Sequence, residues 1–423
     1  MTEPIRPSED SSEAAVTPRD AALAVPHCGW FAGVLFRTFG RPGAMVGGLC
    51  VGFVGFCAVF APLLANSFPL VARQANGELI SPLLKYLKPA DVALPAVLGL
   101  VVLLFLLRKR MGGMWRWALF LLGTVAITSL SYLFVTQPET VVYSGVREQV
   151  AAGEITWALY PPIAFSPSDR LRDVPGVTKP LAPTWSAGAR AAHVTPTGFT
   201  HWLGTDRTGA DIASKMIHAC RIAMAIGFIA TGISLVIGVV LGALMGFFSR
   251  SVDLVGMRLV EVFEAIPVLF LLLTFIAFFG RDIYIMMVII GVTGWTGYAR
   301  FVRAEFLRLR KQDYVQAAQA CGLPLWSILF RHMLPNGITP VLVAASFGIA
   351  SAILYEATLS FLGLGLIDEP SWGQLLEQAT GAGGGFYWWL ATFPGLAIFA
   401  TVLAYNLVGE ALRDALDPKA TSK

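Results

Sequence analysis

Residue types that carry out catalysis are present in this chain, but they do not stand at catalytic spacings. No G-x-x-x-x-G-K-[ST] loop for nucleotide phosphates occurs, and the H-E-x-x-H, G-x-S-x-G and paired-cysteine zinc patterns are absent. We therefore expect neither enzymatic activity nor a bound cofactor or metal. If the chain does work, the energy must come from a partner protein or an ion gradient.

Three carboxylates lie within or beside apolar runs, where ionisable residues are functional candidates. Glu261 and Glu264 stand near one end of such a run, and Glu356 stands near the outer end of another. All three are close enough to an interface to reach water or an Arg, so structural pairing is favoured over a proton relay. The candidates for a translocation path or gate are Glu356, Ser360, Phe361 and Glu261.

His201 and Asp206 are conceivable metal ligands in a polar stretch of the chain. No further His or Cys stands at metal-ligand spacing, so a turn and a capped helix from about Gly209 to Cys220 are favoured. The charged residues of this stretch are expected to form a solvated face: Asp206, Arg207, Asp211 and Lys215.

The composition is that of a membrane protein. Of 423 residues, 56% are hydrophobic and only 14% are charged, whereas a soluble fold would need polar faces on its helices. Several windows of about 18 residues or more carry no charge, which predicts membrane spans. The cysteines form no C-x-x-C pair and are assigned to packing: Cys28, Cys50, Cys57, Cys220 and Cys321.

Eight apolar runs are predicted to span the membrane: 44–64, 92–107, 117–135, 222–248, 259–280, 283–299, 337–355 and about 390–408. Cations cluster in the loops at 108–116, 250–258 and 300–331. The positive-inside rule places these loops and both termini in the cytoplasm. The second run is short, so a re-entrant or tilted helix stays open for it.

The expected organisation is a disordered cytoplasmic tail at 1–36, a first span at 37–64, an outer segment at 65–91, an extra hairpin at 92–135, a Pro-rich periplasmic region of irregular structure at 136–217, a core at 218–412 with a coupling loop at 300–336, and a cytoplasmic tail at 413–423. Within the core, Gly238, Gly242 and Gly246 follow one another at GxxxG spacing, which allows another helix to approach closely.

The stretch 313–335 is expected to form a short water-soluble helix-turn-helix between two spans. Asp313 and Gln316 have the spacing of a capping box. Gly322 and Pro324 are expected to end the helix, with Gly322 at a positive φ.

One face of this helix is predicted to consist of small residues around a single large anchor. Its members recur at helical spacing: Tyr314, Ala317, Ala318 and Cys321. Such a face suits docking into a groove of another protein. Composition alone favours a plainer alternative, an amphipathic connector lying on the membrane.

The order of residues in this stretch resembles the EAA loop of ABC-importer permeases. In that loop a Glu-Ala-Ala triplet is followed by Gly and then by Leu-Pro, and here Gln316 replaces the Glu. In that family the loop is the coupling helix that sits in a groove of the cytoplasmic ATPase. The resemblance implies this coupling role for Asp313, Tyr314, Gln316, Ala317, Ala318, Gly322, Leu334 and Pro335.

Further segments, spread over about residues 200–418, are similar to the second permease subunit of dipeptide and oligopeptide importers. They are LGTDRTGADI at 203–212, RLVEVFEAIP at 258–267, ATLSFLGLG at 357–365, PSWG at 370–373 and GEALRDALDP at 409–418. The segment 63–89 resembles the corresponding outer segment of the microcin C and oligopeptide (Yej-type) permeases.

The resemblance implies an all-α integral membrane protein with the type I ABC-importer fold, here with six core spans and two additional ones. It also implies a homologous permease subunit as heterodimer partner, two cytoplasmic ATPase subunits or one fused ATPase, and a periplasmic peptide-binding protein. The expected location is a bacterial inner membrane, with the lipid bilayer as solvent and no nucleic acid partner.

The implied function is ATP-driven import of oligopeptides or of peptide-like compounds such as microcin C. The alternatives within this class are dipeptides, nickel complexes or another small solute. A secondary transporter would need an inverted repeat and broken helices at mid-membrane, which the sequence does not indicate. A membrane-embedded enzyme would need a convergent catalytic set, which is not visible either.

Overall fold

The computed structural model describes residues 30–136, 138, 141–170, 180–186, 199–248, 250–366, 369–380 and 385–416. Most of the tail predicted at 1–36 lies outside these residues. Its last part is not a tail, because Trp30–Phe39 forms helix α2, which packs against the C-terminal helix. The sequence WFAGVLFRTF is largely apolar, so a neighbouring helix can bury one of its faces.

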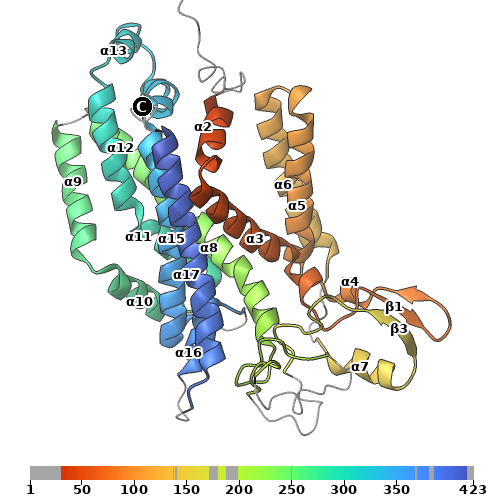
Figure 1. Ribbon diagram of the computed structural model, residues 1–423. Helices are drawn as coiled ribbons and strands as arrows, with labels where there is room; N and C mark the ends of the chain where they lie inside the picture. Colours follow the sequence, from red (N-terminus) through yellow and green to blue (C-terminus); the bar gives the residue numbers. More distant parts are fainter. Residues whose placement is uncertain are drawn as a thin grey trace, which may run out of the picture.

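The protein is a bundle of long apolar helices (Figure 1). Seven helical segments of the described chain are long and apolar enough to cross a membrane, and one bent pair gives an eighth. The prediction of a helical membrane fold with about eight spans is confirmed. The spans contain α3 (Pro42–Leu64), α5 (Pro89–Leu106), α6 (Gly113–Phe134), α8 (Ile212–Phe248), α9 (Arg250–Ala265) with α10 (Val268–Phe279), α11 (Ile283–Thr293) with α12 (Trp295–Leu309), α15 (Thr339–Leu359) and α17 (Trp388–Leu416).

The span predicted at 259–280 is not a single straight helix. Helices α9 and α10 meet at an angle of 80° across the short break at Ile266 and Pro267. A proline lacks the N–H that a continuing helix needs, and it pushes the preceding residue out of the helical region. Pro267 takes φ −59° and ψ 119° and stands directly before α10. Apolarity alone did not indicate this break.

Helix α8 is the longest element and joins two features that the sequence analysis kept apart. The capped helix expected at about 209–220 and the span at 222–248 form one helix of 37 residues. At 1.5 Å per residue it is about 55 Å long, well beyond the roughly 30 Å of a bilayer core. Its first turns therefore extend outside the hydrocarbon.

The glycine row of α8 allows α12 to approach closely, as its spacing predicts. A Cβ atom at Gly238 would lie 2.5 Å from Cβ of Tyr298, and one at Gly242 would lie 2.5 Å from the carbonyl oxygen of Ala299. The pair α8 and α12 therefore packs backbone against backbone.

A small sheet with two short helices projects sideways from the end of the bundle that lies opposite α13 (Asp313–Ala320) (Figure 1). The sheet has the order β2-β1-β3 and is antiparallel throughout. Its elements are β1 (Val71–Gln74), β2 (Leu79–Ile80), α4 (Pro82–Tyr86), α7 (Ser144–Ala151) and β3 (Ile155–Leu159). The expectation of irregular structure from residue 136 onward is wrong for α7 and β3, because no proline stands between Pro138 and Pro161 and the chain is free to form regular elements there.

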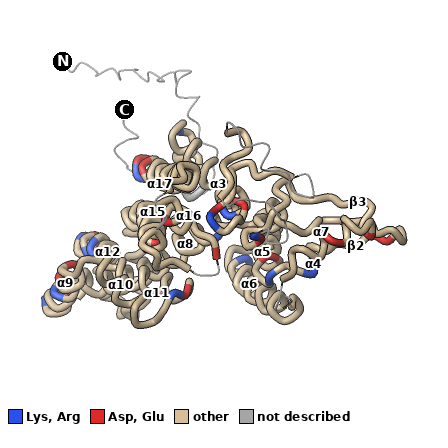
Figure 2. Tube along the Cα trace, turned by 90° about the horizontal axis from the view of Figure 1, so that it is seen from below, with Lys and Arg blue, Asp and Glu red and all other residues tan. Residues whose placement is uncertain are grey.

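The hairpin of α5 and α6 stands beside the bundle and contacts it mainly through α3 and the base of α5 (Figure 1). Nη1 of Arg221 on α8 lies 2.6 Å from Oδ1 of Asp91, and Nζ of Lys88 lies 2.5 Å from Oε1 of Glu369. Arg221 also donates to the carbonyl oxygen of Ala58, at 3.1 Å. Further charged residues gather at α9, at α12, at the end of α17 and along the sheet, while most of the bundle is uncharged (Figure 2).

Candidate coupling site

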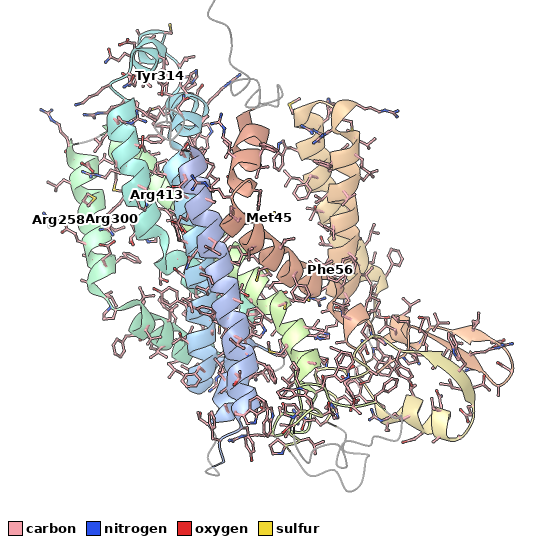
Figure 3. All side chains as sticks on the ribbon, in the orientation of Figure 1. Met45, Phe56, Arg258, Arg300, Tyr314 and Arg413 are labelled. Carbon is pink, nitrogen blue, oxygen red and sulfur yellow. The ribbon has the colours of Figure 1, made fainter. Side chains whose placement is uncertain are left out.

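Helix α13 (Asp313–Ala320) lies at the tip of the hairpin that joins α12 to α15, and Tyr314 stands at this tip (Figure 3). Helix α12 runs to Leu309 and reaches α13 through the three residues 310–312. Arg310 fixes the junction, because its Nη1 donates to the carbonyl oxygen of Phe247 at 3.3 Å. A displacement of α13 therefore acts directly on α12.

The capping box predicted for α13 is absent. The N-cap is Gln312, with extended backbone and no side-chain cap bond, and Asp313 is the first helical residue. Gln316 donates its side-chain amide to the carbonyl oxygen of Lys311, at 3.3 Å. The helix begins one residue earlier than the spacing suggested, so the Asp313 carboxylate lies in its first turn. There the positive end of the helix dipole stabilises the negative charge.

The buried face of α13 is not the one that the sequence predicted. Val315 is fully buried and Ala318 is 7% exposed, and both belong to the protein's own core. Tyr314 is 39% exposed, and Ala317 and Cys321 are also exposed. Assigning Ala318 to the docking face was therefore wrong. Sequence reasoning overlooked Val315, whose signal was an apolar residue three positions before Ala318.

Gly322 ends α13 in the left-handed conformation, as predicted, with φ at +69°. The N–H of Leu323 donates to the carbonyl oxygen of Ala318 at 3.2 Å, and the N–H of Gly322 donates to that of Gln319 at 3.0 Å. These two bonds form a Schellman motif. The chain then turns back toward the bundle.

The returning arm is the π-helix η3 (Ser327–Met333) followed by α14 (Leu334–Gly337). Leu334 is partly buried and packs on the same core as Val315 and Ala318, whereas Pro335 is exposed. The Leu-Pro pair thus lies at the foot of the hairpin, where the chain enters the next span.

Ion pairs join α12 to α9 along the bundle. Nη2 of Arg303 lies 2.7 Å from Oδ2 of Asp253, and Nη2 of Arg300 lies 2.7 Å from Oε1 of Glu264. Glu261 pairs instead with Arg258 of its own helix, and both side chains are exposed. Figure 3 shows Arg258 and Arg300 close to each other beside α9. Glu261 and Glu264 therefore have the structural pairing that the sequence favoured.

Glu356 was expected to reach the membrane interface, but it is buried. Its exposure near the end of α15 is only 2%. Ser360, which is equally buried, donates its hydroxyl to Oε1 of Glu356 at 2.6 Å. Phe361 follows and is 43% exposed. The structure thus brings Glu356 and Ser360 together but leaves Glu261 on a different helix.

The segment after α15 folds back on it tightly. The π-helix η4 (Ser360–Leu364) contains Gly363 at φ +77°, and α16 (Trp372–Ala379) starts at the N-cap Ser371. Its second residue, Gly373, has no room for a Cβ beside the carbonyl oxygen of Ala357. These contacts explain the glycines of this stretch in physical terms.

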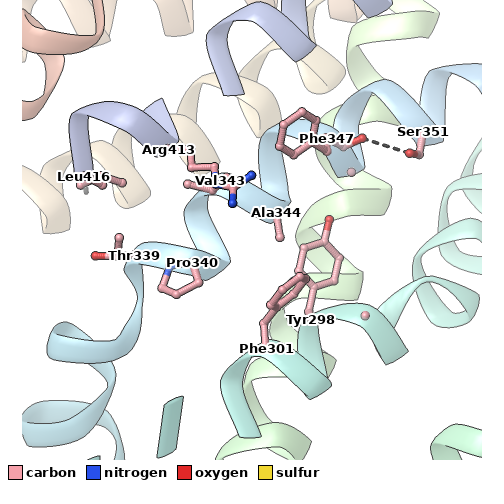
Figure 4. A pocket seen from close by; sticks show the side chains of 12 residues that line it. Tyr298, Phe301, Thr339, Pro340, Val343, Ala344, Phe347, Ser351, Arg413 and Leu416 are labelled. Atoms are coloured by element: carbon pink, nitrogen blue, oxygen red, sulfur yellow. Dashed lines mark hydrogen bonds between the residues drawn. The ribbon is translucent and has the colours of Figure 1, made fainter. Parts of the chain in front are cut away.

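A cavity of about 750 Å³ between α12, α15 and α17 was not anticipated from the sequence (Figure 4). Its wall is largely apolar and aromatic, with Tyr298, Phe301 and Phe347, and Ser351 supplies a hydroxyl. Arg413 is the cation among the residues that line it. It borders α12, the helix that carries α13.

The stretch around His201 forms a buried polar cluster and not the solvated face that was predicted. Asp206 and Asp211 are at most 1% exposed. Nδ1 of His201 lies 2.8 Å from Oδ2 of Asp211, and Asp206 accepts from Lys215 and from the backbone N–H of Thr208 and Ala210. No group of three or more His, Cys, Asp or Glu suited to a metal occurs among the described residues.

The pKa of Asp206 reflects two opposed effects. Burial by itself raises it, but the charge of Lys215 and the hydrogen bonds from Lys215, Thr208 and Ala210 lower it further, so the net shift is below the ordinary 3.8. Asp206 therefore stays ionised as the centre of a fixed turn ahead of α8.

Comparison with known proteins places this arrangement in a family. Residues 238–422 match the binding-protein-dependent transport system inner membrane component. The oligopeptide transport system permease protein OppC of Haemophilus influenzae is 37% identical over 221 residues, which cover 52% of this chain and 70% of the relative. The peptidoglycan transport system permease protein YejE of Agrobacterium fabrum is 33% identical over 276 residues, covering 63% and 72%.

A solved structure, the inward-facing MetNI methionine ABC transporter, is 19% identical with a TM-score of 0.41, and the match covers 48% of this chain and 97% of that one. The family consists of ABC-transporter permeases, which are not themselves enzymes. This chain belongs to the family of binding-protein-dependent transport system inner membrane components.

Proposed function

We propose that the chain is one of two homologous permease subunits of an ATP-driven importer that carries oligopeptides or peptide-like compounds into the cytoplasm. The observation that carries the proposal is α13, a capped helix at the tip of a hairpin that presents Tyr314, Ala317 and Cys321 outward while its other face is fixed to the core. Relatives named as oligopeptide and peptidoglycan permeases support the substrate class.

In this mechanism cytoplasmic ATPase subunits, separate or fused, hold the exposed face of α13. Their closure on ATP displaces α13, and α12 moves with it because only three residues separate the two helices. The ion pairs Arg303–Asp253 and Arg300–Glu264 pass the motion to α9. Since α12 also lines the 750 Å³ cavity, the same motion changes the shape of that space.

The remaining partners follow from the proposed orientation. With α13 and both termini in the cytoplasm of a bacterium, the sheet and the described segments 160–170, 180–186 and 199–210 face the periplasm. A peptide-binding protein delivers substrate there, next to the η4 and α16 turn that holds Glu356 and Ser360. Glu356, Ser360 and Phe361 are the gate candidates.

Dipeptides are the alternative cargo, since relatives include the di/tripeptide permease DppC of Pseudomonas aeruginosa, 36% identical over 260 residues that cover 60% of this chain and 80% of the relative. Secondary transport is disfavoured less strongly than the sequence suggested, because the α9–α10 pair is a broken helix. The docking hairpin has no use in such a transporter, so this observation still favours the ATP-driven one.

Uptake into proteoliposomes that hold the permease pair and its ATPase distinguishes ATP-driven import from ion-coupled transport, and oligopeptide cargo from dipeptide cargo. Radiolabelled penta- and dipeptides should enter only with the binding protein and ATP, with the pentapeptide preferred. Uptake that follows an ion gradient without ATP would contradict the proposed function, and exclusive uptake of the dipeptide would contradict the proposed cargo.

A further inference from the structure

The two faces of the small sheet differ sharply in what they contact. Directly paired residues of neighbouring strands share a face, so Ala72 lies with Ile80 and Ala158, and Arg73 lies with Leu79 and Trp157. The first set packs against α7 and the segment around α4 in one apolar core. The second set has no such cover.

The uncovered face is apolar and aromatic apart from one cation. Leu79 is 70% exposed, Trp157 is 53% exposed and Leu159 is 49% exposed, and Val71 pairs with Leu159 on the same side. Arg73 stands between Leu79 and Trp157 and is the charged residue among the strand positions of this face. A Trp with leucines and an Arg is the combination found where proteins meet the polar surface of a bilayer.

The position of the sheet directs this face toward the membrane. Residues 65–70 link the end of α3 to β1, and fully extended they reach at most about 20 Å, so the sheet stays near the ends of the spans. Figure 1 shows it projecting sideways below the α5–α6 hairpin, with α7 on its lower side, away from the hairpin. The face opposite α7 therefore turns back toward the bilayer that surrounds the hairpin.

The attachment of the sheet is stiff enough to keep this orientation. Arg147 of α7 binds Asp169, with Nη1 2.6 Å from Oδ2, and Asp169 accepts the Ser67 hydroxyl at 2.7 Å. On the other side, the Asp91–Arg221 pair fixes the base of α5 to α8. The last residues of α6, Leu133 and Phe134, are 70% and 73% exposed, so the hairpin also presents apolar side chains at this end.

We propose that the sheet face formed by Val71, Arg73, Leu79, Trp157 and Leu159 rests on the headgroup layer of the leaflet opposite α13, with Arg73 bound to lipid phosphate. The occupant is lipid because the face is apolar and aromatic, lies at the end of the bundle beside the exposed apolar hairpin, and carries a cation that complements phosphate. Through this contact the α5–α6 hairpin and the sheet together hold the permease at a fixed orientation to the membrane surface. The opposite side, with α7, stays free for a soluble partner.

Spin labels on the full chain in phosphatidylethanolamine and phosphatidylglycerol nanodiscs test the proposal. The native cysteines are replaced by serine, and single labels are placed by Leu79→Cys, by Leu159→Cys and, on α7, by the control Glu148→Cys, whose side chain is also exposed. Oxygen concentrates in lipid, whereas a nickel chelate stays in water. The ratio of oxygen to nickel collisions should be several-fold higher at Leu79 and Leu159 than at Glu148.

The role of phosphate is tested with Arg73→Glu, which should lower the ratio at Leu79 while leaving Glu148 unchanged. A ratio at Leu79 and Leu159 equal to that at Glu148 would show a face in water and overturn the proposal. Low collision rates with both reagents in the assembled transporter, but not in the isolated permease, would show a protein on this face, such as the binding protein, and would overturn it equally. Neither outcome bears on ATP-driven uptake.

Discussion

Gly322 closes α13 with a backbone conformation that side chains with a Cβ rarely adopt. Its φ is +69°, and an added Cβ would meet no atom within 4 Å. The position therefore requires glycine for its backbone and not for lack of space. This is a local rule, which is why the sequence predicted it.

Gly322→Val should weaken α13 and its hold on the ATPase, because a β-branched residue at positive φ costs about 1–2 kcal/mol or more. Gly322→Asn is the matched control, since Asn adopts this conformation readily. Co-purification of the ATPase at equal membrane expression is the measurement. If Gly322→Val and Gly322→Asn lose the ATPase equally, the positive φ at this position is not what ATPase binding requires.

Asp206 contributes stability that depends on pH. Its pKa in the folded protein is below the ordinary 3.8. The contribution is therefore complete above that value and is lost as the pH falls through the folded pKa. At neutral pH, Asp206→Asn breaks a buried ion pair and should lower the unfolding free energy by about 3 to 5 kcal/mol.

Thermal unfolding of the purified permease at several pH values checks this expectation. The difference in melting temperature between wild type and Asp206→Asn should stay constant from about pH 6 to about 4 and shrink only as the pH falls below the ordinary 3.8 toward the lower pKa of the folded protein. The exposed carboxylate change Glu148→Gln serves as control and should leave the profile of the wild type unchanged. A difference that stays constant with pH would contradict the ionised Asp206.

Other residues of the site depend on distant contacts, and the sequence misplaced them. Ala318 and Ala317 are equivalent in type, yet only Ala318 turns inward, because the returning arm η3 packs against that side. Asp206 and Asp211 have the composition of a solvated face, but their partners come from the loop and helix around them. The spacing of residues along one helix does not indicate which side of it other segments of the chain will cover.

At the scale of elements, α9 is held to α12 by side chains and not by close backbone contact. Arg303 of α12 and Asp253 of α9 form a two-point ion pair whose side chains are 28% and 17% exposed. Arg258 and Glu261, both on α9, form a pair whose side chains are 72% and 50% exposed. Ion pairs that are shielded from water are worth more than exposed ones. The inner pair is therefore the element-level link in the proposed mechanism.

Arg303→Ala should lower the unfolding free energy by about 1.5 to 3 kcal/mol and lower the ratio of peptide imported to ATP hydrolysed, because the less exposed of the two ion pairs between α9 and α12 is lost. Arg258→Ala, the matched change in the exposed pair, should alter stability by less than about 0.5 kcal/mol. Melting temperature and the ratio of peptide imported to ATP hydrolysed are the two readouts. An unchanged ratio with Arg303→Ala would remove the Arg303–Asp253 pair from the mechanism.

The spans themselves were predictable because a charge-free window of about 18 residues has few alternatives in a folded chain. The bend at Pro267 was not, since a proline also fits the first turn of a helix. The sheet escaped notice because its strands have only four, two and five residues, too short for a reliable alternation pattern. The pairing of β1 with β3 also joins residues more than 80 positions apart in the sequence.

At the scale of the whole molecule, the proposed orientation places α13 and the turn between α5 and α6 on one side. Cations of that turn, Arg108 and Arg110 among them, favour the cytoplasm. A single cysteine introduced by Met111→Cys should resist a membrane-impermeant reagent on intact cells and react in inverted vesicles. Asn76→Cys in the sheet should react on intact cells; the reverse pattern would invert the orientation.

The central claim is that α13 docks into an ATPase through its exposed face, and Ala317→Trp tests it most directly. Ala317 is exposed, so the added bulk spares the core, whereas Ala318→Trp overpacks the protein's own interior at a cost of about 1 to 3 kcal/mol. Gln316→Ala removes one weak hydrogen bond and should be mild. ATPase pull-down is measured beside melting temperature at matched expression.

The account predicts that Ala317→Trp keeps the melting temperature of the wild type and loses the ATPase and uptake, while Ala318→Trp lowers the melting temperature as well. A permease with Ala317→Trp that retains the ATPase and imports peptide at the rate of the wild type would contradict the claim that α13 is the coupling site.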